Sequence, residues 1–544
     1  MRSQHRGPDN TQFMVYYIND VMLAFGFHRL SINGLNAMAH QPMFFGHTVT
    51  LCNGEIWNSD EIHRACDTPN ESGSDCECLS LYYRDIILNG SSKKVADPFE
   101  TLCGIIDGVF GLVMYDRLRN RIYVGRDKIG IRSLYYATET DNVSGTNNVY
   151  VASELKSIPT HMSNVSAFPP AHWAIIDLPD IHCCPVPYWT IRSSRRLAYL
   201  QPDCATDDLH RDLDYNDCCG KLEKLLVRAV EKRFMSDRPI GCVLSGGLDS
   251  TVITAIACKL HRERNVGNET YVPLRTYTIG MEGAEDFKWA RMAAEHLGTE
   301  HHEFVLTENE FLEAIPDVIA QIESYDVTTI RASTGNWLLA QKIAEIGKDT
   351  VLFCGDVADE LLGGYRGFGM TTDADAFDDE NVKMMENIHR FDVLRCEKSF
   401  SGHGLEGRVP FADEDVVDLL MSLPPEYKMW NGDGRIEKDL LRRAFQSYLP
   451  DALVWRRKEA FSDGVSKQQK SWYEIIQDTL VKSGRTSITS RHHASPYDAE
   501  STYYREIYES MYSSVHNIPY LWKQPFSTIA DPSARCLNNY AIKQ

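Results

Sequence analysis

Residues 245–250 read Ser-Gly-Gly-Leu-Asp-Ser and carry the groups needed to hold an anion. Gly246 and Gly247 let backbone amides approach a phosphate, Ser245 and Ser250 add hydroxyl donors, and a following helix adds its positive dipole end. Asp249 could hold the Mg²⁺ that a polyphosphate brings. The segment therefore predicts a phosphate cradle.

The context of these residues supports a nucleotide site. An apolar run at 240–244 precedes them, and Val252, Ile256 and Leu260 recur after them at helical spacing. A glycine-rich turn with a serine N-cap is the simpler alternative, but the strand and helix on either side favour nucleotide binding. No Gly-Lys-Ser/Thr follows, which excludes a Walker A loop.

A second group of chemically useful residues follows the strand predicted at 350–354. Residues 354–360, CGDVADE, place Asp356, Asp359 and Glu360 close together in the chain. Carboxylates beside a phosphate site would repel it unless a divalent cation lay between them, which indicates a metal role for Asp359. An acidic helix N-terminus is the alternative, favoured if this motif stood alone.

The surrounding pattern predicts two domains. Up to residue 190 short strands alternate with turn residues, for example 49–52 followed by Asn53-Gly54, and 122–124 followed by Gly125. Residues 191–207 lack periodicity and predict a linker. From 208 to 544 strands, such as 274–279, alternate with helices, such as 311–319, as in a parallel α/β sheet, and the end of the chain is mostly helical. The acidic stretch 373–380 predicts a solvated loop.

Composition narrows the class of function. The formal net charge of −20 argues against nucleic-acid and anionic-membrane partners, which require a basic surface. We expect a cytoplasmic protein, because the sequence shows no signal peptide and no apolar run long enough to span a membrane. The 15 cysteines include no CxxC pair, so we expect free thiols.

Several motifs resemble one enzyme family. Residues 245–250 are similar to the pyrophosphate loop of ATP pyrophosphatases. Other segments resemble glutamine-hydrolysing asparagine synthetases over nearly the whole chain: 325–334 (YDVTTIRAST), 405–411 (LEGRVPF), 437–438 (EK), 458–464 (KEAFSDG), 5–9 (HRGPD), 29–32 (RLSI), 53–55 (NGE), 73–75 (GSD) and 125–127 (GRD).

The resemblance implies a fold and a reaction. It implies an N-terminal-nucleophile αββα glutaminase domain, truncated at its start, over residues 1–190, and an α/β ATP-pyrophosphatase domain with a helical C-terminal part over 208–544. Such an enzyme uses ATP, Mg²⁺, aspartate, and glutamine or ammonia, and forms asparagine through β-aspartyl-AMP. A homodimer is left open.

The resemblance also implies roles for particular residues. Asp356, Lys438 and Arg331 would be catalytic, and Asp249 and Asp359 would bind metal. ATP and pyrophosphate would contact Val243, Ser245, Gly246, Gly247, Asp249, Ser250, Ile279, Cys354 and Gly355. Aspartate would contact Thr328, Thr329, Arg331 and Ser333. Glutamine would contact Arg29, Asn53, Gly54, Glu55 and Asp75, with Asn53 and the Gly54 amide as the oxyanion hole.

Two departures from the family pattern bear on activity. The family nucleophile is a Cys exposed at position one, whereas here Arg2 follows Met1 and the first cysteine is Cys52. The chain as written is therefore expected to use ammonia, unless the sequence is short at its start. Asp356 stands where the family usually has Glu, which retracts the carboxylate by about 1.5 Å. A catalytically weak regulatory homologue and a β-lactam synthetase remain as alternatives; the second is disfavoured by residues 328–331, which suit aspartate.

Overall fold

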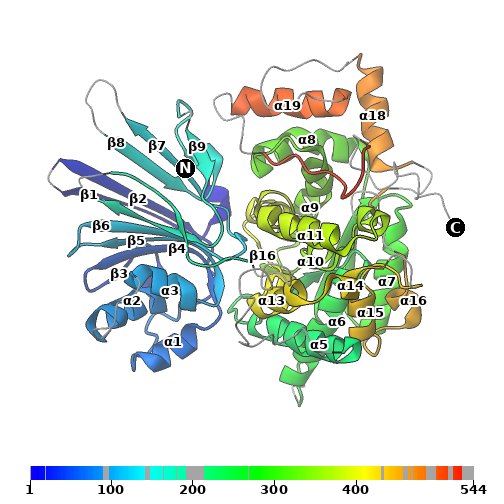
Figure 1. Ribbon diagram of the computed structural model, residues 1–544, viewed down its shortest axis with the longest axis horizontal. Helices are drawn as coiled ribbons and strands as arrows, with labels where there is room; N and C mark the ends of the chain where they lie inside the picture. Colours follow the sequence, from blue (N-terminus) through cyan, green and yellow to red (C-terminus); the bar gives the residue numbers. More distant parts are fainter. Residues whose placement is uncertain are drawn as a thin grey trace.

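The computed structural model describes residues 2–18, 20–89, 97–140, 147–162, 164–178, 181–191, 214–267, 269–430, 434–457, 464–466, 470–484, 498–512 and 519–529. Within these residues the chain forms two parts that lie side by side (Figure 1). The predicted linker, 191–207, lies outside the described residues except for Ile191, so the domain boundaries stay a prediction.

The first half consists of antiparallel strands with helices on one side. Its central sheet has the order β11-β10-β6-β5-β4-β3. The strands are β3 (Met43–Phe45), β4 (Thr48–Ile56), β5 (Gly108–Asp116), β6 (Arg121–Arg126), β10 (His172–Asp177) and β11 (Val186–Pro187). A second layer holds the hairpin β1 (Asn10–Ile18) and β2 (Val21–Arg29), and the sheet β8 (Asn147–Ala152), β7 (Tyr135–Thr140) and β9 (Val165–Ala167).

Apolar packing joins these layers. Phe25 of β2 packs on Val49 and Tyr115 of the central sheet. On the opposite face Phe99 stacks on Tyr123, with ring centroids 4.9 Å apart. That face is covered by the helices α1 (Ser59–Ala65), α2 (Glu77–Asn89) and α3 (Pro98–Ile105) (Figure 1). Stacked antiparallel sheets beside helices agree with the fold that the resemblance implied.

Asn53 and Gly54 do not end a strand, contrary to the turn-like pattern of their sequence. Both lie inside β4, where Asn53 is opposite Gly111 and Gly54 is opposite Phe110 of β5. A Cβ at Gly54 would overlap the Val109 carbonyl oxygen. Glycine is needed here for the close approach of two strands, which the dipeptide pattern of a hairpin conceals. Gly125 likewise lies within β6.

The second half surrounds a parallel sheet of order β14-β13-β12-β15-β16. Its strands are β12 (Ile240–Val243), β13 (Arg275–Met281), β14 (Glu300–Leu306), β15 (Val351–Phe353) and β16 (Glu406–Arg408). After β12 the chain adds β13 and β14 on one side, and β15 and β16 on the other. The carboxyl ends of β12 and β15 therefore meet at a topological switch point, where ligands bind in open α/β sheets.

Helices pack around this sheet and continue beyond it. Val252 and Ile256 of α6 are fully buried, as their spacing predicted. The α-helices are α5 (Tyr215–Lys232), α6 (Leu248–Arg264), α7 (Glu285–Leu297), α8 (Glu308–Ile322), α9 (Val327–Ile346), α10 (Ala358–Leu362), α11 (Ala374–Asn387), α12 (Asp392–Ser401), α13 (Glu414–Ser422), α14 (Pro425–Lys428), α15 (Asp439–Ala444), α16 (Asp451–Val454), α18 (Trp472–Lys482) and α19 (Ala499–Met511). Short 3₁₀ helices are η1 (Gln4–Arg6), η2 (Ala37–Ala39), η3 (Leu155–Ser157), η4 (Arg366–Met370), η5 (Ile388–Arg390) and η6 (Pro410–Ala412). None of the described helices has the length and apolar character needed to span a bilayer.

The acidic stretch 373–380 begins helix α11, and the prediction of a loop there was wrong. Asp373 caps the helix by accepting a hydrogen bond from the Ala376 amide at 3.1 Å. Phe377 is fully buried. The carboxylates hid an N-cap and one buried aromatic residue, which together are enough to start a helix.

The two halves share an interface that is both apolar and charged. Val109 and Ile131 of the first half belong to the same hydrophobic cluster as the core of the second. Ion pairs also cross the interface: Arg6 with Glu397, Arg132 with Glu406 at 2.5 Å, Lys128 with Glu414 at 2.5 Å, and Lys232 with Asp107 at 2.6 Å. The mixed interface fixes how the two halves face each other.

Candidate active site

The loop of residues 245–250 joins the end of β12 to the start of α6. Gly246 has a φ of +77°, and a Cβ there would overlap the Ala290 amide nitrogen. The Ser245 and Ser250 hydroxyl oxygens lie 3.1 Å apart, so both converge on one place. Arg456 donates to the Gly246 carbonyl at 2.6 Å and holds the loop from outside. The loop therefore has one well-defined conformation, and its binding of an anion stays a prediction.

The segment after β15 closes on this loop. A Cβ at Gly355 would lie only 2.5 Å from the Ser250 amide nitrogen, so the two backbones are in direct contact. The switch point of the sheet thus brings together the two motifs found in the sequence, although 105 residues separate Ser250 from Gly355.

Lys438 lies between the two predicted metal ligands. Its ammonium nitrogen is 2.5 Å from Asp249 Oδ2 and 2.6 Å from Asp359 Oδ1. Burial alone would lower the pKa of Lys438, but the two carboxylates outweigh it and raise that pKa above its ordinary value. Lys438 is therefore a cation beside the loop 245–250. Residue types in the sequence predicted Asp249 and Asp359, the family resemblance added Lys438, and the structure places the three groups together.

Asp356 follows Gly355 in the chain and lies half-buried among other charged groups. Burial, and next the negative charge of Asp392, raise its pKa to about 7. Asp392 is held in place because its Oδ2 accepts from the Val357 amide at 2.8 Å and its other oxygen pairs with Arg395. A carboxyl group with a pKa near neutrality can exchange a proton during a reaction.

The residues predicted to surround the base and sugar differ in exposure. Val243 is half-buried at the end of β12. Ile279, in the middle of β13, and Cys354 are buried. Val243 ends β12 and Cys354 follows β15 at the switch point, whereas Ile279 lies on the neighbouring strand β13. Ile279 and Cys354 are inside the core.

Arg331 has a partner within the protein. On α9, its guanidinium forms two hydrogen bonds to Glu500 of α19, from Nε at 2.8 Å and from Nη2 at 2.6 Å. It also stacks over the Tyr473 ring, 4.7 Å from the centroid. Both members of the ion pair are buried. The Arg331 guanidinium, which the resemblance assigned to aspartate, therefore binds a carboxylate of this chain.

The hydroxyl groups near Arg331 are used in different ways. Thr329 binds Asp326, which caps α9, with an Oγ1 to Oδ2 distance of 2.7 Å. The buried hydroxyl oxygens of Thr328 and Ser333 have no hydrogen-bond partner within the described residues. Buried hydroxyls in proteins are normally satisfied, so these two are the polar atoms of α9 best placed to bind a ligand or water.

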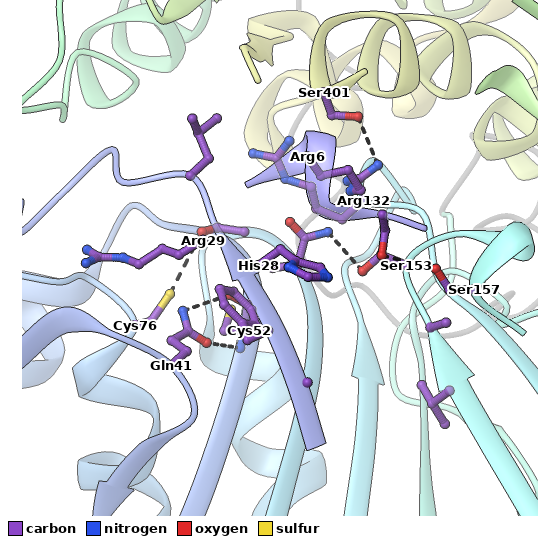
Figure 2. Close-up of a pocket in the computed structure, with 18 of the residues that line it drawn as sticks. Arg6, His28, Arg29, Gln41, Cys52, Cys76, Arg132, Ser153, Ser157 and Ser401 are labelled. Atoms are coloured by element: carbon purple, nitrogen blue, oxygen red, sulfur yellow. Dashed lines mark hydrogen bonds between the residues drawn. The ribbon is translucent and has the colours of Figure 1, made fainter. Parts of the chain in front are cut away.

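The predicted glutamine-binding residues line a cavity of about 720 Å³. Its walls come from both halves: Arg6, Arg132 and Ser401 gather at one end, and Gln41, Cys52 and Cys76 at the other (Figure 2). All five residues assigned to glutamine from the sequence lie on this wall: Arg29, Asn53, Gly54, Glu55 and Asp75.

Within the cavity wall Arg29 has its donors turned to the backbone. It binds the carbonyl oxygens of Asn33 at 2.9 Å and Gly34 at 2.7 Å. Burial lowers its pKa. Asn53 donates weakly to Ser153, at 3.4 Å, so its amide is readily redirected to a ligand.

Two carboxyl groups of the cavity have raised pKa values. Burial raises the pKa of Asp75 to about 6, although the Ile56 amide donates to it at 2.7 Å. Burial, together with the charges of Glu406 and Asp75, raises the pKa of Glu55 well above its ordinary value. Binding a cationic ammonium group here would return both carboxyls to their charged form.

Arg408 connects the cavity to the nucleotide side. Its guanidinium lies 3.4 Å from Glu55, which lines the cavity. Its backbone carbonyl accepts from the Cys354 amide at 2.8 Å, next to Gly355. One residue of β16 therefore contacts both candidate sites.

Comparison with known proteins finds matches to both halves of the chain. A sequence model described as asparagine synthase matches residues 221–372 and 369–533, and one described as a glutamine amidotransferase domain matches residues 1–172. The asparagine synthetase [glutamine-hydrolyzing] of Gallus gallus is 34% identical over 563 residues, covering 99% of this chain and 95% of that protein. The chain belongs to the asparagine synthetase family.

Two further members of the asparagine synthetase family match at similar levels. The enzyme of Mus musculus is 33% identical over 564 residues, covering 99% of this chain and 95% of that protein. A probable asparagine synthetase of Acanthamoeba polyphaga mimivirus is 33% identical over 545 residues, covering 98% and 94%.

Sequence reasoning about the asparagine synthetase motifs missed several residues of these sites. Glu500, Asp392 and Arg456 were not identified, although each contacts or perturbs a predicted residue. No local signal marks them, because their partners lie far away in the chain. Arg408 stood inside the LEGRVPF motif, but nothing in its spacing revealed the contact with Glu55.

Proposed function

We propose that this chain amidates the β-carboxylate of aspartate to form asparagine, with conversion of ATP to AMP and pyrophosphate. The observation that carries the proposal is the cluster of Asp249, Lys438 and Asp359 beside the loop 245–250, at the switch point of a parallel sheet. A preformed anion cradle next to a buried cation suits the release of a charged leaving group.

The first step forms an activated aspartate. A β-carboxylate oxygen of aspartate attacks the α-phosphorus of ATP, and the bond to the pyrophosphate oxygen breaks. The loop amides and the hydroxyls of Ser245 and Ser250 hold the departing pyrophosphate, and Lys438 neutralises charge as it develops. The product is β-aspartyl-AMP.

The second step forms the amide. Ammonia attacks the acyl carbon and AMP leaves with the electron pair of the acyl–oxygen bond. The nitrogen loses a proton in this step, and we assign Asp356 to accept it, because a carboxyl with a pKa of about 7 is an effective base near neutral pH. Thr328 and Ser333 are proposed to bind aspartate, since their buried hydroxyls need partners.

Mg²⁺ is proposed to accompany the nucleotide. Asp249 and Asp359 fit such an ion, because hard carboxylate oxygens from both residues converge within 2.6 Å of one nitrogen. When bound, Mg²⁺ would neutralise phosphate charge. Lys438 would then turn from the carboxylates towards the pyrophosphate.

The first half is proposed to bind glutamine, while ammonia supplies the nitrogen of the second step. Asp75 and Glu55 would bind the α-ammonium, Arg29 the α-carboxylate, and Asn53 with the Gly54 amide the oxyanion. The location of all five on one cavity wall supports this assignment.

Nucleotide chromatography tests the synthetase chemistry. We expect AMP and pyrophosphate from ATP, Mg²⁺, aspartate and ammonium, in equal amounts with asparagine. Asp249→Asn should abolish all three products, whereas Asp217→Asn, at an exposed position of α5, should leave them unchanged. ADP and phosphate as the main products would refute the mechanism, and no nucleotide turnover would favour a regulatory homologue.

A further inference from the structure

Two buried thiols lie next to Asp356. Cys354 follows β15, and Cys396 lies on α12. Their sulfur atoms and a carboxylate oxygen of Asp356 all lie within 4.8 Å of one another. Both thiols are 2% exposed, whereas Asp356 is half-buried. Among the cysteine, histidine and acidic side chains of the described residues, these three lie close enough together to share one ion.

The backbone closes one side of this group. A Cβ at Gly407 of β16 would lie 2.7 Å from the Cys396 sulfur and 3.8 Å from the Cys354 sulfur. The thiols therefore face a strand on that side, and Asp356 is the most exposed member of the group.

We propose that Cys354, Cys396 and Asp356 form a binding site for a thiophilic divalent cation of the Zn²⁺ or Cd²⁺ type, and that the bound ion inhibits the synthetase. The inhibition, though not the binding, rests on the proposed role of Asp356. Each thiol must release its proton to bind the metal, and the carboxylate supplies the third ligand, with water as the fourth.

The geometry suits a tetrahedral ion after small movements. Two thiolates bound to one zinc ion at about 2.3 Å lie about 3.8 Å apart. Ligand atoms that lie within 4.8 Å of one another need to approach by at most about 1 Å, which side-chain rotation supplies. Two sulfur ligands select against Mg²⁺, which prefers oxygen ligands and keeps its water. The substrate metal and the inhibitory metal therefore bind at different places.

Occupancy would remove the base of the second step. A carboxylate that coordinates a divalent cation holds its lone pairs on the metal and cannot accept a proton from the adding nitrogen. The nucleotide loop, Lys438 and Asp249 would remain intact. We therefore expect an inhibited enzyme that still binds ATP.

Cd²⁺ titration tests the site directly. The full chain, freed of metal with a chelator, is titrated with Cd²⁺ while the ultraviolet absorption of the cadmium–thiolate bond is recorded. Cys396→Ala should weaken tight binding by at least about 100-fold, since even outer-shell changes cost 10–100-fold. Cys258→Ala, a buried thiol on α6 outside the group, is the matched control and should bind as the unaltered chain does. Exposed thiols such as Cys184 contribute equally to both.

Two further measurements separate the parts of the proposal. Asp356→Asn should also weaken Cd²⁺ binding. Unchanged binding in Asp356→Asn would overturn the three-ligand site. The site would also be overturned if Cys258→Ala lost as much affinity as Cys396→Ala, or if the unaltered chain showed no tight binding. Ammonium-dependent synthesis is then measured with Cd²⁺ and excess Mg²⁺, at a Cd²⁺ concentration that inhibits the Cys258→Ala control at least tenfold. Cys396→Ala should keep its activity at that concentration. Equal inhibition of both variants would overturn the inhibitory role. A chain that binds Cd²⁺ but makes no asparagine would refute the proposed function and leave the metal site intact.

Discussion

Replacing Arg331 by methionine should destabilise the synthetase half by about 3–5 kcal/mol, the usual cost of leaving one member of a buried ion pair alone. Glu500, its partner, is fully buried and accepts two hydrogen bonds from the guanidinium. Methionine keeps most of the apolar stem but offers no donor. The carboxylate of Glu500 would then be left uncompensated, or would have to bind a proton.

The double variant Arg331→Met/Glu500→Met separates the pair from its parts. Replacing both charges by apolar side chains of similar size is often neutral or stabilising, so most of the lost stability should return. Urea unfolding followed by tryptophan fluorescence measures the free energies of the parent, both single variants and the double variant. Lys342→Met/Glu345→Met, an exposed pair on α9, is the control, and it should change stability by less than about 1 kcal/mol.

The same variants decide whether Arg331 also binds aspartate. If its fork serves the substrate, asparagine formation stays low in the double variant although stability has returned. If Arg331 only ties α19 to α9, activity returns with stability. A loss below about 1 kcal/mol in Arg331→Met, or no recovery in the double variant, would refute the reasoning from a buried pair.

Three other outcomes follow from the sites. Lys438→Met should lower ammonium-dependent kcat by about 10²–10³, the typical cost of removing one group that stabilises transition-state charge; a loss under tenfold, measured as AMP release, would argue against its role. At a fixed concentration of free ammonia, kcat should fall as pH falls through about 7, because Asp356 becomes protonated there and cannot accept a proton. Asp356→Asn should be slow and lack this pH dependence. If the variant kept the pH profile of the unaltered chain, Asp356 would be excluded as the base. Gly54→Ala should separate β4 from β5 at Val109 and remove glutamine binding, measured by calorimetry, while ammonium-dependent synthesis continues; normal glutamine binding would contradict the close approach.

The position of the loop 245–250 between a strand and a helix could be predicted because its sequence signals are local. Residues 245–250 carry their glycines and hydroxyls next to one another in the sequence. Hydrophobic periodicity indicated the strand before them and the helix after them. The partners of these groups could not be predicted in the same way. Lys438 binds Asp249 across 189 residues, and Glu500 binds Arg331 across 169. Such pairs are set by the packing of distant helices, on which sequence spacing carries no information.

Local signals also misled where tertiary contacts outweighed them. Asn-Gly is a strong hairpin signal, yet Asn53 and Gly54 pair along β5, because the strands there approach too closely for any side chain at Gly54. The acidic residues after Asp373 suggested solvent, while Phe377 among them anchors a helix in the core.

The position of Arg408 limits how this protein can be recombined. Its side chain reaches Glu55 of the first half, while its backbone is bonded to Cys354 in the second. A chimera that joined the first half to the synthetase half of a distant relative would need a matching arginine on its edge strand, or Glu55 would lose its guanidinium neighbour. The unit that can be exchanged is therefore the first half together with β16. A chimera joined at the connection between the halves would separate Glu55 from Arg408.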